Sequence, residues 1–188
     1  TNAQQRTIGE IGTDLELARP MHRLLQGDVG SGKTLVAVHA LLTAVQGGYQ
    51  GALMAPTEVL AEQHHTGVTA MLGDLSVPDS STLTGERPLR VELLTNRVAA
   101  GDRRKILADL VTGKVDIIIG THALIQEKVE YAALGVVVID EQHRFGVEQR
   151  AALREKGDAV TAPDVLVMTA TPIPRTAAMT VYGDLDVS

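Results

Sequence analysis

One octapeptide has the residue types and the spacing to hold a phosphate. Residues 27–34 have the sequence GDVGSGKT, which matches G-x-x-x-x-G-K-[ST] at every fixed position. The glycines of such a loop let backbone N–H groups point at phosphate oxygens, while its lysine reaches the β and γ phosphates. The alternative is a glycine-rich turn with a surface lysine. We predict a nucleotide site made of Gly27, Asp28, Val29, Gly30, Ser31, Gly32, Lys33 and Thr34.

Two adjacent acids supply the second half of such a site. The apolar run 136–139 leads directly into Asp140, and Glu141 follows. An aspartate at the end of a strand beside a phosphate loop holds Mg²⁺, together with the hydroxyl of Thr34. The next carboxylate can orient and polarise a water for attack on the γ-phosphate. We therefore predict ATP and Mg²⁺ as ligands, Thr34 and Asp140 at the metal, and Lys33, Asp140 and Glu141 as catalytic residues; two surface acids at a strand end are the alternative.

The elements that must position these residues alternate between strands and helices. Continuous β-branched runs such as VVVI are typical of parallel strands covered on both faces. The pattern predicts an α/β fold, a P-loop NTPase with a doubly wound, mostly parallel sheet and helices on both faces, in one domain. Strands are predicted at 23–26, 52–55, 115–119, 136–139 and 165–168, with a weaker one at 80–83, and helices at 33–45, 58–72, 103–111, 147–154 and 175–181.

Composition and charge exclude several other classes of protein. The 188 residues include no cysteine, so disulfide scaffolds, thiol nucleophiles and cysteine metal sites are excluded. The histidine pair at 64–65 lacks partners at ligand spacing, and we predict no zinc. Seventeen basic against 23 acidic residues give a net charge of −6, which excludes a globally basic nucleic-acid surface. No apolar run is long enough to span a membrane, and because the chain starts with threonine we expect a longer parent protein.

Several strings resemble the motifs of one enzyme class and occur in its order. Residues 140–143 have the sequence DEQH, and GDVGSGKT, APTEVLAEQH (55–64), GTHALIQ (120–126) and MTATPIPRT (168–176) resemble motifs I, Ia, Ib and III of the DEAD-like and DExH helicases of superfamily 2. The longer string DEQHRFGVEQR (140–150) resembles bacterial members that remodel branched DNA. The motor of a transcription-repair coupling factor is the second candidate. It differs from the first mainly at Gln142, where coupling factors typically have glutamate. The resemblance covers the whole chain.

The resemblance implies roles for individual residues and for parts of a larger protein. It implies that this is the first of two RecA-like domains in a cytoplasmic, nucleoid-associated DNA helicase of recombination and repair. A wedge domain and a second RecA-like domain would lie outside this chain. The isolated domain would be nearly inactive as an ATPase because the arginines of the second domain are missing. Gln4 would contact adenine, and Gln142, His143, Thr169 and Thr171 would couple hydrolysis to DNA movement.

Small hydroxyl residues at the ends of strands are the candidates for DNA contact. A strand-to-helix junction offers a hydroxyl donor and backbone N–H groups to a passing phosphate. The same threonines could simply cap helices. Residues 87–114 carry seven basic and three acidic side chains, which form either a DNA-facing patch or a solvated helix face. With the resemblance, the predicted DNA-binding residues are Pro56, Thr57, Thr84, Gly85, Gly120, Thr121 and His122.

Two functions of other classes remain open at this point. A nucleotide-sensing module that never turns over would not need the water-orienting carboxylate of Glu141. A phosphotransferase would need an acceptor site, which the sequence does not indicate. A motor that couples ATP hydrolysis to translocation on DNA is therefore the leading hypothesis.

Overall fold

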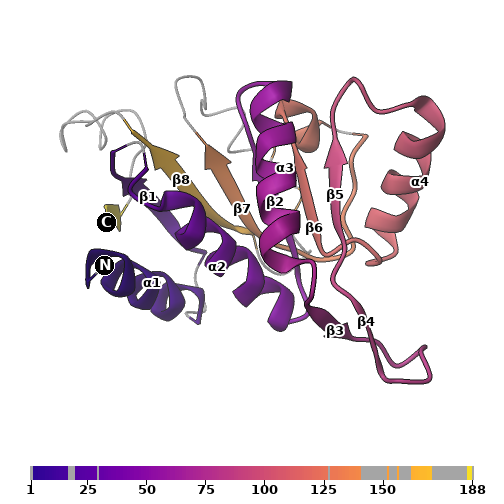
Figure 1. Cartoon of the computed structure of the whole chain (residues 1–188), viewed down its shortest axis with the longest axis horizontal. Helices are drawn as coiled ribbons and strands as arrows, with labels where there is room; N and C mark the ends of the chain where they lie inside the picture. Colours follow the sequence, from indigo (N-terminus) through magenta and orange to yellow (C-terminus); the bar gives the residue numbers. More distant parts are fainter. Residues whose placement is uncertain are drawn as a thin grey trace.

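The computed structural model describes residues 2–16, 20–28, 30–126, 128–140, 152, 156, 162–170 and 186–187. Within these residues, seven parallel strands form one sheet in the order β5-β6-β2-β7-β8-β1-β9 (Figure 1). The strands are β1 (His22–Gln26), β2 (Gln50–Met54), β5 (Val91–Leu94), β6 (Ile117–Gly120), β7 (Leu134–Asp140), β8 (Asp164–Thr169) and β9 (Asp186–Val187). The described helices are α1 (Asn2–Leu15), α2 (Lys33–Gln46), α3 (Glu58–Leu72), α4 (Ala100–Val111) and the 3₁₀ turn η1 (His122–Ile125).

The central strands are buried on both faces, as their apolar runs predict. Successive residues of β7 belong to different core clusters: Val136 and Val138 pack with α2 and α3, whereas Val137 and Ile139 pack with α4 and η1. Side chains of a strand alternate between its faces, so a strand covered on both sides needs apolar residues at every position. The predicted α/β fold with a parallel sheet and helices on both faces is confirmed.

The strand order divides the carboxyl edge of the sheet into two groups of strands. The chain begins its sheet at β1, crosses to β2, runs out to β5, and then comes back inwards through β6 to β7 and β8. As a result β1, β8 and β7 are neighbours on one side, and β2, β6 and β5 are neighbours on the other. Residues that follow these strands meet at the same edge, which is where open α/β sheets bind ligands.

Helix α1 packs against α2 and is joined to β1 by buried charge. Arg23 is 8% exposed, and its guanidinium donates to the carboxylates of Glu10 at 3.0 Å and Asp14 at 2.5 Å. Asp164, at the start of β8, accepts a hydrogen bond from Met21 N at 2.5 Å. Burial raises the pKa of Asp164 to about 6, and the negative charge of Asp14 adds to that shift. The Arg23 contacts hold the second half of α1 against the start of β1.

The weak sixth strand of the sequence prediction is wrong. Residues 80–83 lie in the turn of an antiparallel hairpin made by β3 (Ser76–Pro78) and β4 (Glu86–Pro88), and Leu83 at its tip is fully exposed. The turn is closed by Asp79, whose carboxylate accepts from Ser81 N and Ser81 Oγ. In Figure 1 the hairpin projects from the end of the sheet opposite to the arrowheads of the strands.

The other predicted elements agree with the structure to within a few residues. The five continuous runs correspond to β1, β2, β6, β7 and β8, and three predicted helices correspond to α2, α3 and α4. The predicted helices at 147–154 and 175–181 lie almost entirely outside the described residues. No helix among the described residues is both long enough and apolar enough to cross a bilayer.

Candidate nucleotide and nucleic-acid sites

The loop after β1 has the backbone geometry that its glycines allow. Gly30 and Gly32 have φ angles of +82° and +84°, a conformation that side-chain-bearing residues rarely adopt. A side chain on Gly27 would meet Ser31 Oγ at 2.7 Å, so this glycine lets the loop fold back on itself. Gly32 is the N-cap of α2, and the helix starts at Lys33 without a side-chain cap on its first N–H groups. The loop therefore presents a helix N-terminus, a favourable place for an anion.

The Lys33 side chain lies along the inside of this loop. Its ammonium donates to Gly27 O at 2.5 Å and to Asp28 O at 2.8 Å. The amine is thereby held within a ring of backbone groups at the first turn of α2, the position from which it would reach phosphate oxygens. Thr34 is half-buried in the same turn. The sequence-predicted residues of the loop thus lie together, except Val29, which is outside the described residues.

Gln4 reaches the loop from a distant part of the sequence. Its side-chain amide donates to Ser31 O at 2.8 Å. The amide also lies so close to Gly32 that a β-carbon there would overlap it. Sequence reasoning placed Gln4 at the adenine through a family resemblance alone, whereas the structure brings it against the phosphate loop through the packing of α1 on α2.

Asp140 ends β7 on the same side of the sheet. Its side chain is 13% exposed, and its Oδ2 lies 2.5 Å from His64 Nε2 on α3. Between β7 and β1 lies β8, whose last residue, Thr169, is buried and accepts a hydrogen bond from Gly27 N at 3.2 Å. The phosphate loop, Thr169 and Asp140 are thus consecutive along the edge. Glu141, Gln142, His143 and Thr171 lie outside the described residues.

The oxygen donors at this edge are of the kind that Mg²⁺ takes. Asp140 offers a carboxylate and Thr34 a hydroxyl, and Mg²⁺ is usually held by one or two protein oxygens together with substrate phosphates and water. Among the residues that the structure describes, no group of three or more His, Asp or Glu side chains could hold a metal ion by itself. The donor set therefore suits a metal that arrives with a nucleotide.

The neighbouring strands β2 and β6 end in the other predicted residues. Pro56 and Thr57 are exposed after β2, and Thr57 Oγ1 accepts from Leu60 N at 3.3 Å, which caps α3. Thr121 precedes η1 without a side-chain cap, and His122 is exposed. Thr57 therefore caps a helix, as the alternative interpretation predicts, whereas Thr121 does not.

Gly120 has a structural reason to be glycine. It is buried at the end of β6, its carbonyl accepts from Ala55 N at 2.8 Å, and a β-carbon would overlap Leu94 O of the adjacent strand. It thus holds β2, β6 and β5 together at the edge, whatever else it contacts.

Two predicted residues do not lie at this edge. Thr84 and Gly85 were expected to follow a strand at 80–83, but both lie in the β3–β4 turn, where the Thr84 hydroxyl donates to Glu86 O at 3.0 Å. The strand that reaches the edge is β5, and the threonine that follows it is Thr95, which sequence reasoning missed. Thr95 is 1% exposed, and its hydroxyl has no hydrogen-bond partner among the described atoms. The string LLT, with a threonine directly after apolar residues, was the available signal.

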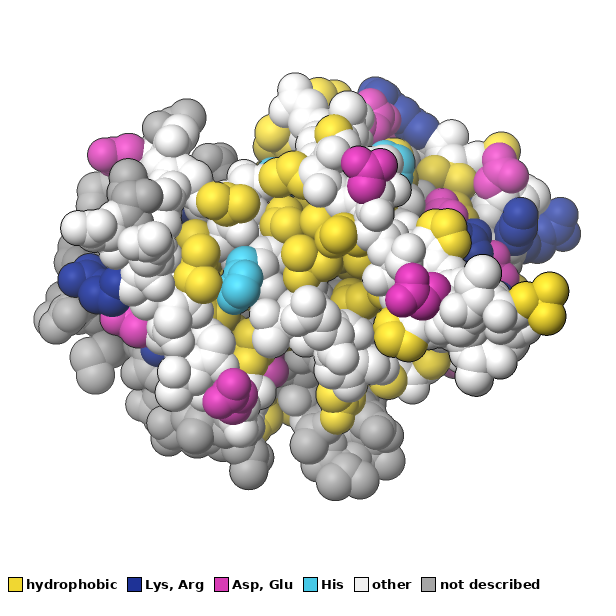
Figure 2. Space-filling view, turned by 60° about the horizontal axis from the view of Figure 1, so that its bottom comes forward, with side chains coloured by type: hydrophobic (Ala, Val, Ile, Leu, Met, Phe, Trp, Pro, Cys, Tyr) yellow, Lys and Arg dark blue, Asp and Glu magenta, His cyan; other side chains and the backbone are white. Residues whose placement is uncertain are grey.

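Three of the seven basic residues in segment 87–114 are paired with acidic neighbours. Arg87 forms a two-pronged pair with Asp116, Arg90 contacts Glu92 and Asp109, and Arg97 reaches α3. On the face drawn in Figure 2, Lys and Arg side chains stand in separate groups among acidic ones, with apolar side chains between them. The ion pairs favour a solvated, internally paired surface over a DNA-facing patch for these three arginines.

Comparison with known proteins identifies the class to which this site belongs. The family model described as DEAD/DEAH box helicase matches residues 1–180, and the chain belongs to this family. Over its whole length it is similar to ATP-dependent DNA helicase RecG, with 57% identity to the protein of Synechocystis sp. over 21% of that protein and 53% identity to that of Bacillus subtilis over 25% of it. The chain thus spans about a quarter of the length of these relatives.

Solved structures give the same result. A structure of RecG bound to a three-way DNA junction matches all of this chain with a TM-score of 0.81 and 45% identity, over 23% of its own length. The helicase domain of Pyrococcus furiosus Hef matches 99% of this chain, over 37% of its own length, with a TM-score of 0.64; at 16% identity it supports the fold alone.

Proposed function

We propose that this chain is the ATP-binding motor domain of a DNA helicase that remodels branched DNA. The observation that carries the proposal is one sheet edge with two kinds of site. A phosphate loop, Thr169 and Asp140 occupy the β1-β8-β7 half, and strand-end threonines occupy the β2-β6-β5 half. We call these the nucleotide half and the nucleic-acid half. The similarity to RecG supports branched DNA as the substrate over the transcription-repair role.

In the proposed mechanism, the loop binds the phosphates and the acids activate water. Lys33 exchanges its backbone acceptors for β- and γ-phosphate oxygens, which compensates the charge of the nucleotide. Thr34 and Asp140 would hold Mg²⁺, which would supply positive charge beside the phosphates. Glu141 accepts the proton of the attacking water, and its place directly after Asp140 in sequence supports this role. Because Gly27 N bonds Thr169 O, a shift of the loop is transmitted to the strand that carries the motif III-like residues.

In the nucleic-acid half, the proposed contacts are to the backbone of the strand. Thr57 and Thr121 follow β2 and β6, so they lie along one line of strand ends, whereas Thr95 after β5 is buried and offers no exposed hydroxyl. Hydroxyl and backbone N–H donors at such junctions bind phosphate without reading bases. Recognition of the branch itself, and the arginines that complete the ATP site, are proposed to reside in a wedge domain and a second RecA-like domain outside this chain.

Nucleotide binding provides the first test. Lys33→Ala should lower the affinity for Mg·ATP by at least ~100-fold in calorimetry, because the cation facing the phosphates is removed. Lys105→Ala is the matched control, because Lys105 is an exposed lysine of α4, away from the phosphate loop. This variant should bind Mg·ATP like the unaltered chain. Unchanged Mg·ATP affinity of the Lys33→Ala variant would contradict the phosphate-loop assignment.

The proposed substrate is tested by ATP hydrolysis of the full-length protein. Forked DNA should stimulate hydrolysis more than linear duplex DNA does.

A further inference from the structure

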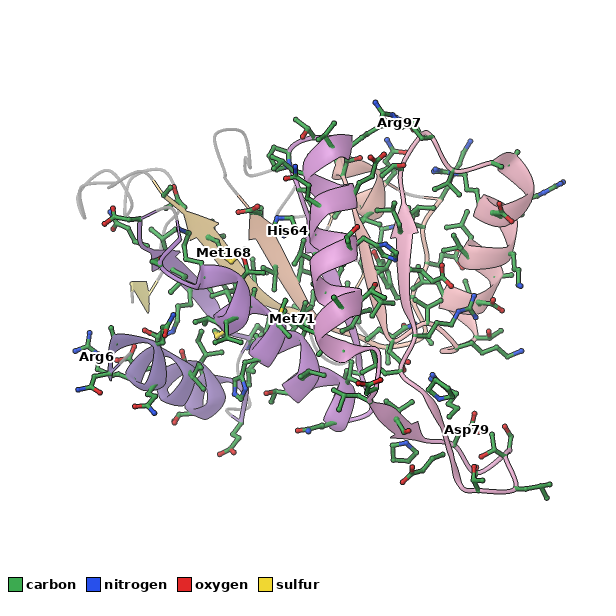
Figure 3. The ribbon with its side chains drawn as sticks, in the orientation of Figure 1. Arg6, His64, Met71, Asp79, Arg97 and Met168 are labelled. Atoms are coloured by element: carbon green, nitrogen blue, oxygen red, sulfur yellow. The ribbon has the colours of Figure 1, made fainter. Side chains whose placement is uncertain are left out.

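Asp140 has a partner that the phosphate-loop mechanism does not require. His64 Nε2 lies 2.5 Å from Asp140 Oδ2, and the two side chains are 14% and 13% exposed. The histidine comes from α3, which follows β2, and the aspartate ends the neighbouring strand β7. Figure 3 shows His64 between α3 and the end of β7. The contact therefore crosses the boundary between the nucleotide half and the nucleic-acid half.

The position of His64 on α3 is one that apolar residues otherwise occupy. The buried residues of the helix are Ala61, Val68 and Leu72, and His64 lies in the same stripe, three residues after Ala61 and four before Val68. A polar side chain is costly in such a stripe unless it is hydrogen-bonded. Asp140 satisfies that requirement. The adjacent His65 points elsewhere and lies 3.4 Å from Val91 O of β5.

The same helix is attached to the loop after β5 by its first two turns. Glu58 accepts a hydrogen bond from Asn96 N at 3.0 Å, and Arg97 contacts Glu58 and Glu62, each at 3.2 Å. The cap at Thr57 lies at the start of this turn. Helix α3 thus connects residues proposed to contact nucleic acid with the carboxylate proposed to hold the metal.

We propose that His64 is a positioning residue that orients the Asp140 carboxylate toward the metal of a bound Mg·nucleotide and fixes it to α3. The inference rests on the proposed function. By donating Nε2–H to Oδ2, the imidazole fixes the rotation of the carboxylate and leaves Oδ1 to hold the metal. Groups that hydrogen-bond a metal-ligating carboxylate in this way fix its orientation and contribute to metal affinity. A change at the metal is then transmitted through one hydrogen bond to the helix that Thr57 caps.

Manganese binding separates this role from a merely structural one. We would measure Mn²⁺ affinity by electron paramagnetic resonance at saturating non-hydrolysable ATP analogue, and analogue affinity in EDTA. His64→Leu fills the space without a donor and should weaken Mn²⁺ binding by ~10–100-fold, the scale of losses in such outer contacts, with analogue affinity in EDTA unchanged. His64→Gln, whose amide nitrogen can replace Nε2, should lie within about threefold of the unaltered chain.

His65→Leu is the matched control, because it removes an imidazole from the same helix without touching Asp140, and it should leave Mn²⁺ affinity unchanged. Equal or tighter Mn²⁺ binding by His64→Leu overturns the inference, as does an equal loss in His65→Leu. A loss of analogue affinity in EDTA in His64→Leu also overturns it, since the residue would then support the fold of the loop. If the unaltered chain binds no nucleotide, the proposed function fails and this inference with it.

Discussion

The nucleotide half and the nucleic-acid half of the sheet edge are built in different ways. The first is made mainly by eight contiguous residues whose bonds are local, such as Lys33 Nζ to Gly27 O and to Asp28 O. The second is made by single residues at the ends of three strands, separated by whole helices. A contiguous motif carries its geometry in its sequence, whereas dispersed contacts depend on which strands the topology makes neighbours.

The largest effect should come from the nucleotide half. Glu141→Gln in the full-length protein should lower ATP turnover by about 10²-fold or more, because the amide keeps the shape of the side chain and loses the proton acceptor. Affinity for ATP should change little. Phosphate release under steady-state conditions measures the first and calorimetry the second. Glu130→Gln, an exposed acid before the same strand, is the control. Turnover like that of the control would remove Glu141 from the mechanism.

The next effect is on stability and belongs to the nucleic-acid half. Gly120→Ala should lower the free energy of unfolding by about 1–3 kcal/mol, because the β-carbon meets the Leu94 carbonyl in a packed edge. Gly67→Ala on α3 is the matched control: no atom lies within 4 Å of its β-carbon, and alanine is the better helix former. Urea unfolding followed by circular dichroism compares the two. If both variants unfold like the unaltered chain, the close approach of β5 and β6 is wrong.

Thr57 and Thr121 distinguish capping from binding within this half. Thr57→Ala should cost ~1 kcal/mol of stability, since its hydroxyl caps α3, whereas Thr121→Ala should cost almost none. If both contact phosphate, both should weaken binding of single-stranded DNA in a salt-dependent manner. Fluorescence anisotropy at two salt concentrations, beside urea unfolding, gives the two readouts. Loss of DNA affinity only in the destabilised variant would indicate that the threonines act through the fold.

An effect on the pH dependence of stability lies away from both halves, at the amino end of β8. The folded state holds the proton of Asp164 more tightly than the unfolded chain does, because its pKa is raised to about 6 from 3.8. The free energy of unfolding should therefore fall as pH rises from about 4 to 7. Asp164→Asn retains an acceptor for Met21 N and should remove that part of the dependence. The variant should therefore gain stability relative to the unaltered chain between pH 4 and 7. If it does not, the raised pKa of Asp164 is wrong.

The sequence predicted the strands whose apolar runs are continuous and missed the strand whose apolar run is interrupted by a charged residue. VVVI identified β7 because every position is apolar, whereas β5 (VELL) contains Glu92 and is half-exposed at the edge of the sheet. Because β5 was missed, the predicted contact was placed at Thr84, which lies in the β3–β4 turn. The pairing of His64 with Asp140 has no sequence signal, since 76 residues separate them and only the adjacency of β2 and β7 brings them together.

One hydrogen-exchange experiment tests the division of the edge most directly. Exchange of backbone amides would be measured with Mg·ATP analogue and, separately, with single-stranded DNA. Nucleotide is expected to protect residues 27–36 and the end of β7, and DNA to protect residues 56–60, 95–97 and 120–124. DNA should leave the β3–β4 turn at 79–85 unprotected. Overlapping footprints, or protection by DNA centred on that turn, would contradict the assignment of nucleotide and nucleic acid to separate halves.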